Sequence, residues 1–299
     1  MNLNFDAIVV GSGISGGWAA KELCESGLKT LVLERGRMVK HIEDYPTMNL
    51  DPWDVKHGGK TTQEELKNYN KQRRWGVNEG NRHFYNKDSE YDYEEDKPFD
   101  WIRGTQVGGR SLIWGRQTYR WSDDDFEANL RDGIAIDWPV RYKEIAPWYS
   151  YVENFIGVSG EALNLPQLPD SEFLPPMELN CVEKKLKKSI AKNYSDRILT
   201  IGRVAHITKG TKTGAGRGPC QYRNRCDRGC PYGSYFSSNS STLPVAEKTG
   251  NLTIRPDSVV TEVLYNKKTQ KATGVRIVDT KTKEVFDFKA KVIFLCASS

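Results

Sequence analysis

Three closely spaced cysteines are the residues of this sequence that most directly suggest metal chemistry. Cys220, Cys226 and Cys230 form the pattern Cx5Cx3C, which ends in Pro231. Four arginines accompany them: Arg217, Arg223, Arg225 and Arg228. Cysteines bind metals as thiolates, and nearby guanidinium groups favour the thiolate. Three cysteines suit a three-iron (3Fe-4S) cluster better than a structural zinc, which takes four protein ligands.

Two other readings of this segment stay open from the residues alone. The thiols are structural and buried in a cysteine-rich loop, or they bind zinc with His206 as the fourth ligand. The remaining cysteines stand apart in the chain. Cys24 and Cys296 lie in apolar surroundings, where a free cysteine behaves as a small hydrophobic residue.

A glycine-rich turn near the N-terminus predicts a dinucleotide site. It follows an apolar strand, precedes a helix and has the pattern GxGxxG, made by Gly11, Ser12, Gly13, Ile14, Ser15 and Gly16. Such glycines let backbone N–H groups approach a pyrophosphate, and the phosphates then lie at a helix N-terminus, which favours negative charge.

An acidic residue in the expected place strengthens this prediction. Glu34 ends the next strand, 23 residues after Gly11, with Arg35 beside it. A carboxylate at that position accepts hydrogen bonds from an adenosine ribose and opposes a 2′-phosphate, so NADP is disfavoured. The pattern by itself does not distinguish NAD from FAD.

The elements that must position these residues are short strands and helices. We expect a strand over 6–10, a helix over 16–26 and a strand over 31–33, which together form a βαβ unit. Further helices are predicted over 138–157 and 182–197, the second an amphipathic surface helix. Five short strands are predicted near the end, over 252–254, 259–265, 274–278, 285–288 and 292–296.

These elements divide the chain into five predicted segments. Residues 1–40 form the βαβ unit, 41–100 a long excursion that resembles a lid, and 101–160 a second glycine-rich loop with a helix. Residues 161–235 hold a proline-rich linker and the cysteine segment, and 236–299 supply the return strands. The fold class is therefore α/β, with a Rossmann-like parallel sheet and added antiparallel strands.

Composition excludes several classes of protein. Hydrophobic residues make up 37% of the chain, and no apolar run is long enough to span a bilayer. We read no signal peptide, so a cytoplasmic location and export with a partner both remain open. The net charge of +5 is spread along the chain, which argues against nucleic acid as a partner.

Two longer motifs carry a family resemblance. The stretch GSGISGGWAAKELCESGLKTLVLERG at the start and RGTQVGGRSLIWGRQTYRW over 103–121 resemble the glucose-methanol-choline (GMC) oxidoreductases. The sequence Asp137-Trp138-Pro139 and NLTIRPDSVVTEVL over 251–264 are also similar to that family, and within it to bacterial sugar and gluconate dehydrogenase flavoproteins.

The resemblance implies FAD as the cofactor and part of a second, substrate-binding domain. It implies contacts with FAD from these further residues: Gly108, Gly109, Ser111, Trp114, Gly115, Val260, Ala297 and Ser298. Many relatives have an asparagine at the position of Trp114. Some relatives attach the flavin covalently through a histidine, but that position here is Ile113, so we expect noncovalent FAD.

The resemblance also implies the activity, which is hydride transfer from a CH–OH group of a sugar or alcohol to the flavin. Electrons would leave through the cluster to a cytochrome or small-subunit partner. We assign no catalytic residue, because we expect the family's histidine base beyond residue 299. An FAD-binding fragment without turnover and an oxidase without metal are the alternatives.

The four histidines do not suggest a proton relay of their own. His41, His57, His83 and His206 lack a neighbouring nucleophile or a carboxylate at a useful spacing, so each is interpreted as a surface or lid histidine. We expect that the chain as given, loaded with FAD, leaves its flavin oxidised when mixed with sugars or alcohols.

Overall fold

The computed structural model describes residues 3–90, 93–210 and 216–298, and the chain divides into two compact units. The first unit consists of Met1–Trp114, Arg223–Pro231 and Ser237–Ser299. The second consists of Gly115–Tyr222 and Tyr232–Phe236. None of the helices in the described residues is long and apolar enough to cross a membrane.

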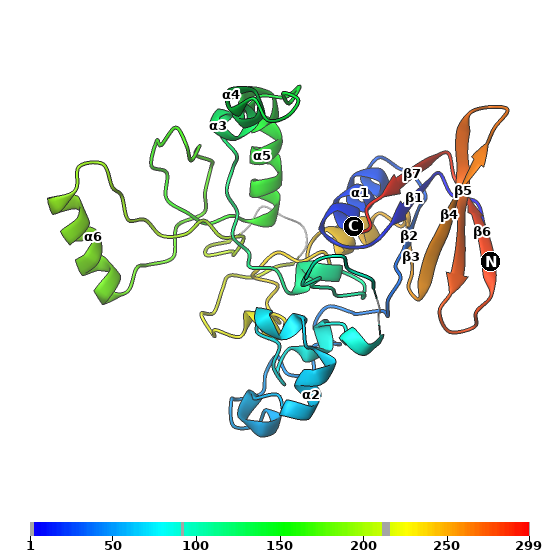
Figure 1. Cartoon of the computed structure of the whole chain (residues 1–299), viewed down its shortest axis with the longest axis horizontal. Helices are drawn as coiled ribbons and strands as arrows, with labels where there is room; N and C mark the ends of the chain where they lie inside the picture. The colour runs from blue at the N-terminus through cyan, green and yellow to red at the C-terminus, as the bar shows by residue number, and fades with distance from the viewer. Residues whose placement is uncertain (1–2, 91–92, 211–215, 299) are drawn as a thin grey trace. The chain divides into compact units, whose positions relative to one another are not determined.

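A four-stranded parallel sheet forms the centre of the first unit (Figure 1). Its strands are β1 (Ala7–Val10), β2 (Thr30–Leu33), β3 (Leu252–Arg255) and β7 (Val292–Leu295), in the order β3-β2-β1-β7. Helix α1 (Ile14–Glu25) connects β1 to β2. The predicted βαβ unit is therefore confirmed, with helix and strand bounds within two residues of those expected.

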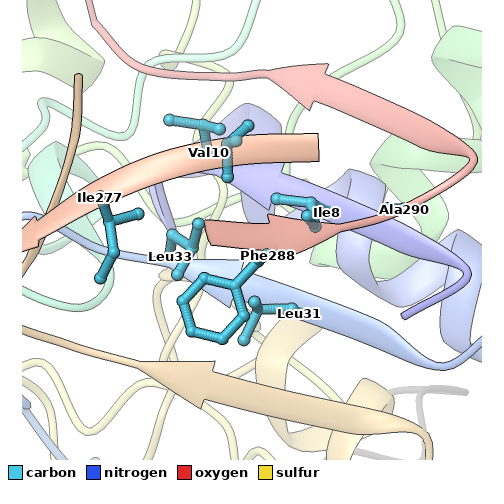
Figure 2. Packing of buried hydrophobic residues seen from close by; sticks show 8 residues of the cluster. Ile8, Val10, Leu31, Leu33, Ile277, Phe288 and Ala290 are labelled. Atoms are coloured by element: carbon cyan, nitrogen blue, oxygen red, sulfur yellow. The ribbon is translucent and has the colours of Figure 1, made fainter. Parts of the chain in front are cut away.

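An antiparallel sheet covers one face of the parallel sheet. It consists of β4 (Ser258–Asn266), β5 (Lys271–Asp279) and β6 (Val285–Lys289), in that order. Figure 2 shows the buried cluster between the two sheets, to which Ile8 and Leu31 contribute from one side and Ile277 and Phe288 from the other. Because side chains alternate along a strand, residues two apart in β1 and β2 share this face.

Helices cover the opposite face of the parallel sheet. Val9 and Val32, one residue out of step with the first cluster, pack with Ala20 of α1 and Leu243 of α7 (Thr242–Lys248). The uninterrupted apolar runs of β1 and β2 are thus explained, since these strands are buried on both faces.

The predicted excursion contributes more to the core than expected. Residues 41–100 contain helix α2 (Gln63–Asn68) and four short 3-10 helices: η1 (Lys56–Gly59), η2 (Gln72–Trp75), η3 (Arg82–Phe84) and η4 (Asp88–Glu90). Tyr45 and Phe84 are fully buried and pack with Val39 and Leu112 in a third cluster. This part of the chain is anchored to the unit through its aromatic side chains, which sequence periodicity does not reveal.

The second unit contains four helices among its described residues. They are α3 (Asp123–Phe126), α4 (Ala128–Asp132), α5 (Tyr142–Ile156) and α6 (Cys181–Asn193). We expected a helix from residue 138, but α5 begins at Tyr142, because the carboxylate of Glu144 accepts the N–H of Arg141 at 2.9 Å and fixes the start there.

Helix α6 also ends earlier than predicted. It stops at Asn193 rather than 197, and its apolar residues Val182 and Leu186 remain exposed, so its amphipathic pattern covers no core in this unit.

Buried ion pairs organise the interior of the second unit. The Arg120 guanidinium bonds the Glu153 carboxylate at 2.5 Å, with both side chains nearly inaccessible to solvent. Arg203, equally buried, bonds Asp170, which also accepts the N–H groups of Leu163 and Asn164. The proline-rich segment predicted as a linker is therefore fixed to the unit around Asp170.

Candidate dinucleotide site and cysteine segment

The glycine turn after β1 lies against the end of β7. Gly11 has φ +93°, and a Cβ on it would lie 2.9 Å from the carbonyl oxygen of Cys296 and 3.2 Å from Cα of Ala297. Only glycine fits both the backbone conformation and the space. The structure thus places Ala297, predicted from the resemblance, beside the GxGxxG turn.

Gly13 leaves the N-terminus of α1 open to a ligand. It is the N-cap residue of α1, with φ −65°, and a Cβ on it would meet nothing within 4 Å. The residue that follows, Ile14, is exposed, as is Ser15. A glycine that no neighbouring protein atom requires is consistent with close approach by a pyrophosphate to the first N–H groups of the helix.

Glu34 is buried at the end of β2 and bonded to the glycine turn. One carboxylate oxygen accepts the N–H of Ser12 at 3.0 Å and its hydroxyl at 2.5 Å, and the other accepts the N–H of Gly36 at 3.2 Å. Each carboxylate oxygen has two acceptor positions, so capacity remains for ribose hydroxyls. The predicted ribose contact therefore fits this carboxylate, whereas the neighbouring Arg35 is exposed.

A second glycine loop meets the first in the same unit. Gly108 donates its N–H to the hydroxyl of Ser12 at 3.0 Å. A Cβ on Gly109, which has φ +50°, would lie 3.3 Å from Cα of Gly13. The 3-10 helix η5 (Gly109–Leu112) carries the buried Ser111. The structure therefore brings together the two loops that the sequence predicted for FAD.

The other predicted cofactor residues are less tightly grouped. Trp114 is the last residue of this part of the first unit, whereas Gly115 belongs to the second unit. Val260 pairs with Ile277 in the antiparallel sheet and packs against the cluster between the sheets. Ser298 follows Ala297 and is exposed. Their contacts with a cofactor remain predictions.

Sequence reasoning missed a buried polar segment behind the two loops. Residues 237–242 read Ser-Ser-Asn-Ser-Ser-Thr, and every one is at most 5% exposed. The hydroxyl of Ser238 donates to the Gly13 carbonyl at 2.9 Å, and the Asn239 amide donates to the Val107 carbonyl at 3.0 Å. Six consecutive polar residues, the last of them the first residue of α7, were the available signal, because such residues are seldom buried without specific partners.

Gly17, which follows the GxGxxG pattern and is not part of it, makes room for this segment. A Cβ on Gly17 would lie 2.5 Å from Oγ1 of Thr242 and 2.8 Å from Oγ of Ser238. Its position in α1 therefore lets the helix and the polar segment approach closely.

The three cysteines of the predicted cluster are divided between the two units. Cys220 belongs to the second unit, whereas Cys226 and Cys230 belong to the first, Cys226 in the 3-10 helix η6 (Cys226–Arg228). Within the described ranges, no group of three or more His, Cys, Asp or Glu side chains is arranged to hold a metal ion. The cluster remains a prediction from sequence.

The arginines of this segment have partners that the sequence did not suggest. Arg223 donates to the Met48 carbonyl at 2.5 Å, Arg225 bonds the Asp51 carboxylate at 2.5 Å, and Arg228 donates to the Leu50 carbonyl at 3.2 Å. In the second unit, Arg217 donates to the Gly233 carbonyl at 2.8 Å. These arginines fix the backbone of their own units, a role beyond the thiolate stabilisation we expected.

Two histidines differ from the surface residues we expected. Burial, with a smaller effect from Arg37 and Arg82, lowers the pKa of His83 to about 4. Burial, followed by Arg116 and Arg217, lowers the pKa of His206 to about 4. Both imidazoles are therefore neutral near pH 7.

The isolated cysteines behave largely as predicted. Cys24 is buried in α1, and burial raises the pKa of its thiol. Cys296 is partly buried against the apolar cluster on the helix-covered face of the parallel sheet, and burial raises the pKa of its thiol as well. Neither environment favours a reactive thiolate.

Comparison with known proteins identifies one family over nearly the whole chain. Residues 5–299 match the family model described as GMC oxidoreductase. The chain is 25% identical to 2-methyl-1,2-propanediol dehydrogenase of Mycolicibacterium austroafricanum, over 98% of this chain and 49% of that protein. It is 27% identical to the gluconate 2-dehydrogenase flavoprotein of Pantoea cypripedii, over 94% and 48% of the two chains.

Two further matches agree with this assignment. The fructose dehydrogenase large subunit of Gluconobacter japonicus is 24% identical, over 86% of this chain and 46% of that protein. Pyridoxine 4-oxidase from Mesorbium loti has the same fold, with a TM-score of 0.54 at 16% identity, over 98% of this chain and 49% of that one. The chain spans about half the length of the curated relatives it matches.

Proposed function

The chain belongs to the GMC oxidoreductase family of FAD enzymes, and from that membership we propose that it acts in the oxidation of a CH–OH group of a sugar or other small polyhydroxylated compound. The observation that carries the proposal is the meeting of the two glycine loops at Gly13, where no protein atom fills the space of a Cβ. The names of the relatives support the substrate class, since a diol, gluconate and fructose all carry CH–OH groups.

Different residues of the first unit would hold different parts of FAD. The N–H groups at the start of α1 would bind the pyrophosphate, and Glu34 would accept the ribose hydroxyls. FAD supplies an acceptor for the hydride of the CH–OH carbon, which protein side chains do not provide. The buried Ser12, bonded to both Glu34 and Gly108, keeps the ribose and pyrophosphate positions in register.

Binding of FAD to this chain is the direct test. We expect one noncovalent FAD per chain, because Ile113 occupies the position of the attachment histidine in some relatives. Acid precipitation should leave the yellow chromophore in the supernatant, and flavin in the pellet would contradict noncovalent binding. Failure of the folded chain to bind FAD would refute the proposal.

The substrate class has its own test. FAD-loaded protein is mixed anaerobically with aldoses, aldonates and 1,2-diols, each beside its deoxy analogue. Bleaching of the flavin by the hydroxylated compound alone would support the proposed class, and it would overturn our expectation that this chain by itself leaves its flavin oxidised. If no compound bleaches the flavin, the function of this chain reduces to FAD binding, which is the alternative.

An electron exit through an iron-sulfur cluster is a second, separate part of the proposal. The three thiols of Cys220, Cys226 and Cys230 would supply the ligands. Protein purified anaerobically should contain iron, and Cys226→Ser should lose it. Cys181→Ser is the matched control, since Cys181 is an exposed cysteine outside the pattern. Zinc in place of iron, or iron retained in Cys226→Ser, would exclude the cluster.

A further inference from the structure

The buried polar segment behind the glycine loops has contacts that point to a role in cofactor binding. We propose that Ser238 and Asn239 are positioning residues that set the spacing of the two FAD loops, so that both loops reach one dinucleotide at once. The inference rests on the proposed use of FAD but concerns residues that belong to neither loop.

Ser238 contacts both loops. Its hydroxyl donates to the Gly13 carbonyl of the first loop at 2.9 Å. Its backbone N–H donates to Oγ of Ser111 in the second loop at 3.0 Å, and that hydroxyl in turn donates to the Gly108 carbonyl at 2.5 Å. Ser238 is fully buried, so water does not compete for these bonds. A single residue thus bridges the carbonyl side of both loops.

Asn239 fixes the second loop to the segment that follows β2. Its amide donates to the carbonyls of Val39 at 2.7 Å and Val107 at 3.0 Å. Its Oδ1 lies 1.7 Å from the place a Cβ of Gly108 would take, and it is buried with no hydrogen-bond partner among the described residues. The Asn239 side chain therefore packs directly against Gly108 and leaves no space for a Cβ at that position.

The side of the first loop opposite its carbonyl contacts is available to a ligand. Ser238 and Asn239 bond the loop carbonyls, which leaves the N–H groups at the start of α1 for an anion. The N–H groups of Gly108 and Gly109 in the second loop are already bonded to the protein, so that loop would contact FAD through its surface. Because FAD would lie across both loops, a change in loop spacing should weaken its binding more than the binding of a ligand held by the first loop alone. AMP is such a ligand, because it lacks the second phosphate and the flavin.

The same segment offers a matched control. Ser237 is 2% exposed, but its hydroxyl bonds Ser240 within the segment, at 2.9 Å to Oγ and 3.2 Å to the backbone N–H. Ser237→Ala and Ser238→Ala each remove one buried hydroxyl from neighbouring positions. Only Ser238→Ala removes a contact with a cofactor loop.

The experiment measures FAD and AMP affinity of the full chain and its unfolding in urea without ligand. Ser238→Ala should weaken the affinity for FAD about tenfold relative to Ser237→Ala, as expected for one buried hydrogen bond. The AMP affinities of the two variants should agree within about twofold, and their urea midpoints should be similar. Asn239→Ala should weaken FAD further. Should Asn239→Ala not fold, Ser238→Ala decides.

Two results would overturn the inference. Equal FAD affinity in Ser238→Ala and Ser237→Ala would show that the bridge does not set the loops. Equal weakening of FAD and AMP would show general destabilisation in place of positioning. Absence of FAD binding by the unchanged chain would instead refute the proposed cofactor, so the two failures are distinguishable.

Discussion

Substitution of Gly13 by alanine should separate cofactor binding from folding. In the ligand-free chain a Cβ on Gly13 meets nothing within 4 Å, and its φ of −65° and ψ of −160° suit an alanine. The loss of a glycine N-cap costs less than about 1 kcal/mol of the free energy of unfolding. The folded state should therefore be nearly unchanged.

The expected effect on FAD follows from the same geometry. The added methyl group occupies the space through which a pyrophosphate approaches the first N–H groups of α1. Displacing the phosphates removes one charge-assisted hydrogen bond, which is worth about 1.5–3 kcal/mol. The dissociation constant for FAD should rise between about tenfold and about 100-fold.

Two other glycines give the assay its controls. A Cβ on Gly210 also meets nothing within 4 Å, and Gly210 belongs to neither loop, so Gly210→Ala should change neither property. A Cβ on Gly274 would lie 2.0 Å from the backbone oxygen of Phe288, so Gly274→Ala should lower stability by about 3 kcal/mol or more.

The assay combines urea unfolding of the ligand-free chains with titration of FAD fluorescence. If Gly13→Ala binds FAD as tightly as the unchanged chain, the open position is not where the pyrophosphate binds, and the reasoning fails. Loss of folding in Gly13→Ala would refute the claim that the space is unfilled by protein.

Three further perturbations test other parts of the structure. The pKa of about 4 for His83 and His206 lies below the ordinary 6.5, so the unfolded chain takes up protons first. At about 1.36 kcal/mol for each pKa unit, stability should fall by roughly 3 kcal/mol per histidine as pH drops from about 6.5 to about 4. Urea unfolding should show a smaller loss in His83→Gln, and an unchanged pH slope would contradict the assignment. Glu153→Ala leaves the buried Arg120 guanidinium without its carboxylate and should lower the free energy of unfolding by about 3–5 kcal/mol in the same assay. A loss under about 1 kcal/mol would contradict this expectation. Glu34→Ala should weaken FAD at least tenfold by removing the ribose acceptor and the bond to Ser12, and unchanged affinity would exclude that contact.

Short-range pattern was enough to predict the α/β class and the residues that form the candidate cofactor site. The GxGxxG turn, the strands around it and Glu34 are neighbours in sequence or lie one βαβ unit apart, so local spacing determines their geometry. The five late strands were found for a similar reason, because each is a short run rich in apolar residues bounded by turn residues.

The tertiary structure alone decided which distant segments meet those loops. Ser238 lies 225 residues from Gly13, and nothing in its local sequence indicates which carbonyl its hydroxyl would contact. Burial of Phe84 and Tyr45 in the predicted excursion likewise depends on Val39 and Leu112, from other parts of the chain. A side chain's own type predicts that it needs a partner, but the partner is chosen by the packing of the whole unit, and a periodic pattern carries no record of that choice.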